Sequence, residues 1–378
     1  MIAVSPTAIV RQRAAELRRQ GRPVHDLSAG ELDLPTPGHI VDAAAAAAAL
    51  PENHHYGATA GTDSLRQAVA ERLGARSPGP VDAASVVITH GDKQALFNTF
   101  SAVLQPGDEV LVPAPYWVTF PATIRLAGGE PVIVAPDPAT LKVTPEALEA
   151  ASSSATTSLL VCSPNNPTGL AYTEAEFRAL LSWAADRGIR VISDETYVDL
   201  SFGELSTPAE VEPRIADRLV RVGSVSKSFA MTGWRVGWLA GPAEIVKRAT
   251  AVQSHTTGSV CGINQAAALA ALTGPDVTSG FREILRGRLS RCRAVLGPAG
   301  LMPHQPDGAF YVFADVRSID PDDAVVAERL AQHGVITVPG SSFGTPGWLR
   351  LSYAVADDHL AAGLNHIVDL IAEGSKQP

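Results

Sequence analysis

Seven short apolar runs, separated in most places by segments of helix length, constrain the fold of this chain more than any other feature. They lie at residues 85–90, 108–115, 131–136, 158–169, 190–197, 218–227 and 235–241. Most are apolar at consecutive positions, which is typical of strands that are buried on both faces. Strands of this kind alternating with helices predict an α/β fold, with a mostly parallel seven-stranded sheet between helices.

Polar residues close several of these runs. His90-Gly91, Ser163, Asp194 and Ser224 each stand where an apolar run ends. Parallel sheets bind ligands beyond the carboxyl ends of their strands, so we expect a functional site along that edge of the sheet.

The pattern changes after about residue 275. A long charged helix at 281–297 leads into shorter apolar runs and a final helix from about residue 356. We therefore predict a large domain at 46–275 and a smaller α+β domain at 276–378. Residues 1–45, with a helix between Ser5-Pro6 and Gly21, are too few for a domain and are expected to pack with the smaller one.

Composition excludes several classes of protein. The net charge of -9 and the lack of a Lys/Arg cluster argue against a nucleic-acid partner. No apolar run is long enough to span a membrane, and residues 1–25 lack the apolar stretch of a secretory signal. Cys162, Cys261 and Cys292 lack metal-binding spacing, so we expect free thiols, no metal site and a cytoplasmic location.

Lys227 is the first candidate for chemistry, in the segment GSVSKSFAMTGWRVGW. Ser224, Ser226 and Arg235 supply hydroxyl groups and a guanidinium that can hold a dianionic phosphate beside the amine. An amine near a cation loses basicity, which suits a lysine that forms a Schiff base. The alternative, a solvated surface lysine, stays open on this local pattern alone.

Asp194 ends the run RVIS and is the second candidate. It could cap a helix, or it could face a heterocyclic nitrogen and keep it protonated. Tyr197 could lie on the same side, or simply pack. The rigid string SPNNPTG at 163–169 exceeds what a plain turn requires, and the residues GDKQ at 91–94 open a helix whose free N–H groups can bind phosphate.

Four motifs occur in order: SPNNPTG, SDETY, SVSKSFAMTGWRVGW and WLRLSYA. Together they resemble the fold type I pyridoxal-phosphate aminotransferases of class I and II, and most of all the bacterial aspartate aminotransferase subgroup. The resemblance covers nearly the whole chain. It implies pyridoxal 5'-phosphate as cofactor and a homodimer with shared active sites.

The resemblance also implies a role for each matching residue. Lys227 matches the Schiff-base lysine, which also moves a proton, and Asp194 matches the partner of the pyridinium nitrogen. Tyr197 and Asn166 match the pair at the phenolic oxygen, and Trp117 matches the aromatic residue stacked on the ring. The phosphate-binding positions are Gly91, Asp92, Lys93, Ser224, Ser226 and Arg235, with Tyr56 reaching in from the neighbouring subunit. Substrate would be bound by Arg350 at its α-carboxylate, with Gly30, Trp117 and Asn166 nearby.

The expected reaction is transamination between an L-amino acid and a 2-oxo acid. Lys93, in GDKQALFN, resembles a lysine linked to the distal carboxylate of acidic substrates, which favours aspartate or glutamate; a solvent-facing or phosphate-neutralising lysine is the alternative. The family's Gly-Glu-Pro-Asp-Phe is Gly-Glu-Leu-Asp-Leu here, with Leu32 and Leu34. A specialised elimination, cyclisation or oxidation on the same fold stays open. So do site and packing roles for His54, His55 and His255.

A regulatory, non-enzymatic domain of the same fold would carry a helix-turn-helix extension. The first predicted helix begins near residue 5, so this class is not expected.

Overall fold

The structure is a computed structural model that describes residues 3–374. Its main sheet has seven strands in the order β2-β8-β7-β6-β5-β3-β4. Neighbouring strands are parallel except where β8 pairs, antiparallel, with β2 and β7. The predicted mostly parallel, seven-stranded sheet is thus confirmed. The strands are β2 (Val86–Thr89), β3 (Glu109–Pro113), β4 (Glu130–Val134), β5 (Thr156–Cys162), β6 (Arg190–Asp194), β7 (Leu219–Ser224) and β8 (Gly237–Ala240).

Both faces of this sheet are covered, which explains the uninterrupted apolar runs. In β3, Val110 and Val112 pack on one face, whereas Leu111 packs on the other. Helices α4 (Asp92–Val103) and α9 (Ala243–Thr256) contribute to the core on the first face, and α6 (Pro145–Ala151) and α7 (Glu174–Asp186) to the core on the second. Burial of apolar area on both faces stabilises the sheet at about 25 cal/mol per Å².

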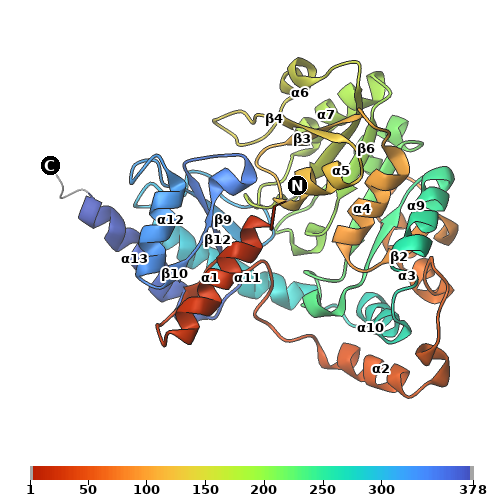
Figure 1. The fold of residues 1–378 in the computed structure, drawn as a ribbon, viewed down its shortest axis with the longest axis horizontal. Helices are drawn as coiled ribbons and strands as arrows, with labels where there is room; N and C mark the ends of the chain where they lie inside the picture. The colour runs from red at the N-terminus through yellow and green to blue at the C-terminus, as the bar shows by residue number, and fades with distance from the viewer. Residues whose placement is uncertain (1–2, 375–378) are drawn as a thin grey trace.

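A third group of helices covers β2 and β8. Helices α2 (Gly38–Ala48), α3 (Asp63–Gly74) and α10 (Gly262–Thr273) share a core with Ile88 and Trp238. Figure 1 shows α2 beside α10, at the opposite end of the molecule from α13. The alanine-rich α2 therefore packs with the large sheet's helices, so the segment expected to associate with the smaller domain ends before residue 38 rather than at 45. The three-part division of the chain otherwise stays a prediction.

The smaller part of the molecule draws on both ends of the chain. Strands β11 (Val338–Pro339), β12 (Trp348–Ser352) and β9 (Tyr311–Asp315) form an antiparallel sheet. Strand β1 (His25–Asp26), near the amino terminus, pairs in parallel with β10 (Val335–Ile336). Figure 1 shows α1 (Pro6–Arg19) among the helices of this part, α11 (Thr278–Leu296), α12 (Asp323–Gln332) and α13 (Asp357–Gly374). This confirms the predicted α+β unit built from both chain ends.

Short helices complete the fold: α5 (Thr119–Leu126), α8 (Pro208–Val211), η1 (Pro51–His54), η2 (Ala83–Ser85), η3 (Val198–Leu200), η4 (Pro213–Ile215), η5 (Thr232–Trp234) and η6 (Gly340–Phe343). Across residues 3–374, none of the helices has the length and apolarity needed to cross a bilayer.

Candidate active site

A cavity of about 910 Å³ opens at the carboxyl edge of the large sheet, where the smaller part of the molecule meets it. Ten of the predicted site residues line it: Gly30, Asp92, Lys93, Trp117, Asn166, Asp194, Tyr197, Lys227, Arg235 and Arg350. The remaining four predicted residues, Gly91, Ser224, Ser226 and Tyr56, are not in its wall. Residues separated by up to 320 positions in the chain therefore line one cavity.

Lys227 lies three residues after the end of β7, with its side chain in the cavity. Its Nζ donates a hydrogen bond of 2.7 Å to the carbonyl oxygen of Gly30. Burial lowers the pKa of Lys227, although the nearby carboxylates of Asp92 and Glu31 oppose that shift. The amine is therefore held by one neutral acceptor and is easier to deprotonate than a surface lysine, as a nucleophilic amine requires.

Asp194 is the last residue of β6 and is 3% exposed. Its Oδ1 accepts a hydrogen bond of 3.1 Å from the backbone N–H of Thr196. Burial raises the pKa of Asp194 to about 7, and the negative charge of Asp92 adds to the effect. A cationic ring nitrogen placed against this carboxyl group would reverse the shift, because an adjacent positive charge favours the ionised form.

Asn166 and Tyr197 meet in the wall of the cavity. The side-chain amide of Asn166 donates to Tyr197 Oη at 3.4 Å, and both residues are buried. Tyr197 Oη also lies 3.0 Å from Tyr311 Oη. Sequence reasoning missed Tyr311, because within GAFYVFADV it has the pattern of an ordinary strand residue, and only the tertiary pairing of distant segments places it here.

Arg350 projects from β12 and is 2% exposed. Its Nη1 donates to Asn166 Oδ1 at 3.1 Å and its Nη2 to the carbonyl oxygen of Ser28 at 2.6 Å. The guanidinium carbon lies 4.5 Å from the centre of the Tyr311 ring. Its Nε has no hydrogen-bond partner among the described residues. A buried guanidinium with a vacant donor fits an anionic ligand, and carboxylates are the planar acceptors it binds best.

The amino-terminal end of α4 forms a cradle with Arg235. Gly91 has φ +81°, a backbone conformation that favours glycine, and a Cβ atom there would lie 2.5 Å from Arg235 Nη2. The buried hydroxyl of Ser226 has no partner among the described residues. Free N–H groups at a helix start and the guanidinium beside them form a donor set that suits a phosphate, and the unpartnered hydroxyl of Ser226 belongs to the segment after β7 that carries Lys227. With the amine of Lys227 and the carboxyl group of Asp194 in the adjoining cavity, the residues present fit pyridoxal 5'-phosphate.

Trp117 and Lys93 form another part of the wall. Lys93 Nζ lies 5.2 Å from the centre of the Trp117 ring. Loss of solvent lowers the pKa of Lys93; Asp92 opposes the shift, and Arg235 and Arg11 add to it. Arg11, from α1, also lines the cavity, and sequence reasoning missed it because nothing in the amino-terminal helix distinguished it from a surface arginine.

Tyr56 is fully exposed, at 103% of its reference area, and it does not line the cavity of its own chain. The neighbouring His54 and His55 are also exposed, as is His255 near the end of α9. None of these histidines is in the wall of the cavity. Among the side chains that the structure describes, no group of three or more His, Cys, Asp or Glu residues could hold a metal ion.

Comparison with known proteins agrees with this geometry. The family model described as aminotransferase class I and II matches residues 22–367. The chain therefore belongs to the class I and II aminotransferases, and it is a pyridoxal-phosphate-dependent enzyme that transfers amino groups.

Individual relatives are similar over almost their full length. An aspartate aminotransferase of Streptomyces avermitilis is 43% identical, covering 98% of this chain and 95% of the relative. An aspartate/prephenate aminotransferase of Thermus thermophilus is 40% identical, covering 97% and 96%. The solved structure of Thermus thermophilus aspartate aminotransferase with maleate superposes with a TM-score of 0.92 at 39% identity, covering 98% and 97%.

Proposed function

We propose that this enzyme exchanges the amino group of L-aspartate or L-glutamate with a 2-oxo acid. The observation that carries the proposal is the distribution of cations in one cavity. Arg350 is buried beside Asn166, whereas Lys93 and Arg11 reach the same cavity from α4 and α1. A dicarboxylate has one carboxylate for each of these two cationic regions. The names of the relatives include aspartate, and maleate, present in the Thermus structure, is itself a dicarboxylate.

The bound cofactor supplies an electron-withdrawing ring that stabilises negative charge at the substrate Cα. We assign to Lys227 the covalent link to the cofactor and, once released from it, the transfer of a proton between Cα and C4'. The lowered pKa of Lys227 supports this role, because the amine must be neutral to accept that proton. Asp194 would hold the ring nitrogen of the cofactor, where the carboxylate would favour the protonated ring.

The other residues orient cofactor and substrate. Asn166 and Tyr197, which already contact each other, would bind the phenolic oxygen, and Trp117 would stack on the ring. The phosphate would be held by the backbone N–H groups of Gly91, Asp92 and Lys93 at the start of α4, and by the side chains of Ser224, Ser226 and Arg235. This leaves the Lys93 side chain free for the substrate. Arg350 would bind the substrate α-carboxylate through two parallel hydrogen bonds, with Gly30 alongside.

Dimerisation and location complete the proposal. The fully exposed Tyr56 supports a homodimer in which this phenol reaches the phosphate of the neighbouring subunit, because its side chain is free for such a contact and does not line the cavity of its own chain. The three cysteines are free thiols, which supports a cytoplasmic location.

A spectral survey of substrates tests the proposed function. The holoenzyme is mixed with single amino acids, and conversion of its visible absorption band to that of the aminated cofactor is followed. We expect conversion with aspartate and glutamate at lower concentrations than with alanine or phenylalanine, and reversal by 2-oxoglutarate. Preferential conversion by an apolar amino acid would contradict acidic substrate choice.

A further inference from the structure

Asp199 connects the two segments that carry the predicted catalytic groups. It lies in η3, two residues after Tyr197, and it does not line the cavity. Its Oδ2 accepts a hydrogen bond of 2.9 Å from the hydroxyl of Ser228, the residue that follows Lys227. One carboxylate therefore joins the segment after β6 to the segment after β7.

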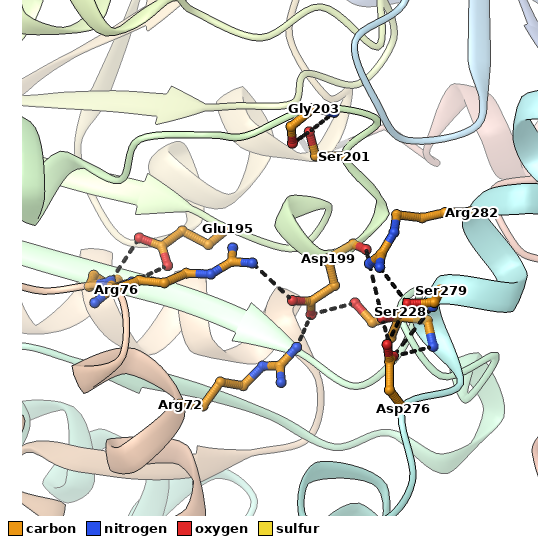
Figure 2. A network of polar contacts seen from close by, with 12 residues as sticks. Arg72, Arg76, Glu195, Asp199, Ser201, Gly203, Ser228, Asp276, Ser279 and Arg282 are labelled. Carbon is orange, nitrogen blue, oxygen red and sulfur yellow. Dashed lines mark hydrogen bonds and ion pairs between the residues drawn. The ribbon is translucent and has the colours of Figure 1, made fainter.

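Two arginines compensate the charge of Asp199. Arg72, in α3, forms an ion pair with Oδ2, and Arg76 Nη2 lies 3.8 Å from Oδ1. Figure 2 shows the Asp199 carboxylate between Arg72 and Arg76, with Ser228 on its other side. Because only 13% of the Asp199 side chain is exposed, an ionised acceptor here makes a stronger and more directional bond to Ser228 than water would.

The backbone of Asp199 is held as well. Arg282, in α11, donates to the carbonyl oxygen of Asp199 at 2.8 Å and to Thr278 Oγ1 at 3.0 Å. The hydroxyl of Thr278 in turn donates to Asp276 at 2.7 Å. Figure 2 shows Arg282, Ser279 and Asp276 beside Asp199 and Ser228. The start of α11, which leads into the smaller part of the molecule, is thus tied to the same point.

Asp199 is the one hydrogen-bond partner of the Ser228 hydroxyl among the described residues. Ser228 itself is 1% exposed. We propose that Asp199 is a positioning residue for transamination, which through Ser228 holds the backbone of Lys227 in a fixed relation to Asp194 and Tyr197. This inference rests on the proposed role of Lys227 as the residue that binds the cofactor.

The test uses the holoenzyme and three variants: Ser228→Ala, Asp199→Asn and the double variant. Ser201→Ala is the matched control, because Ser201 is also a buried serine next to η3 and its hydroxyl bonds only to backbone groups of Gly203 and Asp307 among the described residues. Four quantities are measured: kcat, the pH midpoint of the visible absorption band, the unfolding temperature of the apoprotein, and the lysine labelled by borohydride.

We expect Ser228→Ala to lower kcat about tenfold, because a displaced lysine reacts more slowly. Its absorption midpoint should move from the wild-type value, whereas its unfolding temperature should match that of Ser201→Ala. The double variant should be no slower than the slower single variant, because both changes break the same contact.

If Ser228→Ala keeps the wild-type kcat and absorption midpoint and borohydride still labels Lys227, the positioning role of Asp199 is wrong, whereas the proposed role of Lys227 stands. A fall in unfolding temperature without change in kcat or midpoint would also overturn the positioning role, because the contact would then be only structural. Label on another lysine in the wild type would overturn the role of Lys227 and this inference with it.

Discussion

Arg350 Nη1 donates a hydrogen bond of 3.1 Å to Asn166 Oδ1, joining residues that are 184 positions apart. Asn166 lies in the turn that follows β5 of the large sheet, whereas Arg350 projects from β12 of the smaller one. The proposed substrate-carboxylate site therefore spans the two sheets, so its geometry depends on how they are packed together.

Replacing Arg350 by lysine should raise KM for every amino acid substrate. Lysine keeps the charge but loses the planar fork, so kcat/KM should fall about 100-fold or more for aspartate and alanine alike. Steady-state kinetics with both donors measures this, and equilibrium dialysis should show that cofactor affinity stays close to wild type. A loss confined to aspartate would show that Arg350 binds the distal carboxylate instead.

Borohydride reduction of the holoenzyme should fix the cofactor on Lys227. Peptide mapping by mass spectrometry identifies the modified residue. Lys227→Ala should lower kcat by at least about 10²–10⁴-fold, the range of acid–base catalysis alone. Lys247→Ala, a change at an exposed lysine of α9, is the control and should leave both label and rate unaffected.

Asp194→Asn should change the pH dependence of apoprotein stability. Burial raises the pKa of Asp194 from 3.8 to about 7, so between those values the folded carboxyl group keeps a proton that the unfolded chain has lost. The contribution of Asp194 to the free energy of unfolding of the wild-type apoprotein therefore falls as pH rises from about 4 to about 7. The amide of the variant does not titrate, so its stability lacks this pH dependence. The unfolding temperature of the variant minus that of wild type should therefore be more positive at pH 8 than at pH 5.

Thermal unfolding of both apoproteins at the two pH values measures this difference. An equal difference at pH 5 and pH 8 would show that Asp194 is not protonated in the folded apoprotein. In the holoenzyme, kcat of the variant should fall far more than cofactor affinity, because a neutral amide cannot keep the ring nitrogen protonated.

The holoenzyme should sediment as a dimer at micromolar concentration. Tyr56→Ala should raise the Kd for the cofactor about tenfold, the loss of one hydrogen bond to a charged group. Fluorescence titration of the apoprotein measures this Kd. His55→Ala, in the same exposed segment, should leave it unchanged. A fully active monomer would contradict the role proposed for Tyr56.

Lys93→Ala should lower kcat/KM for aspartate about 10- to 100-fold while changing the value for alanine or phenylalanine little, because only aspartate has a distal carboxylate to lose its cation. Arg11→Ala should act in the same direction. Arg13, on the same helix but paired with Glu328 at 3.0 Å, provides the control. An equal fall for all donors would instead assign Lys93 to the cofactor phosphate.

The strands of the large sheet, and Lys227 and Asp194 as candidate residues, could be predicted from the sequence because their signals are local. The roles proposed for Arg350, Trp117 and Tyr56 came only from the resemblance of whole motifs to a family. Each strand of the large sheet is an apolar run, and Asp194, for example, ends such a run. The segment GVITVPG at 334–340 is one continuous, mostly apolar run, but the structure divides it at Thr337 between pairing with β1 and pairing with β12. Tyr311 and Asp199 could not be assigned, because their partners come from distant elements that only tertiary packing brings close.

The direction of β8, the one antiparallel strand of the large sheet, determines which residues of the candidate site are carried on a common loop. Ser224 of β7 pairs with Gly237 of β8, so the connection between them leaves and re-enters the sheet at one edge. Lys227 and Arg235 are both carried on that short closed loop, whereas Lys93 and Arg11 belong to other elements. Substitutions on α1 and α4 can thus alter the proposed substrate contacts of Lys93 and Arg11 without changing the spacing between Lys227 and Arg235.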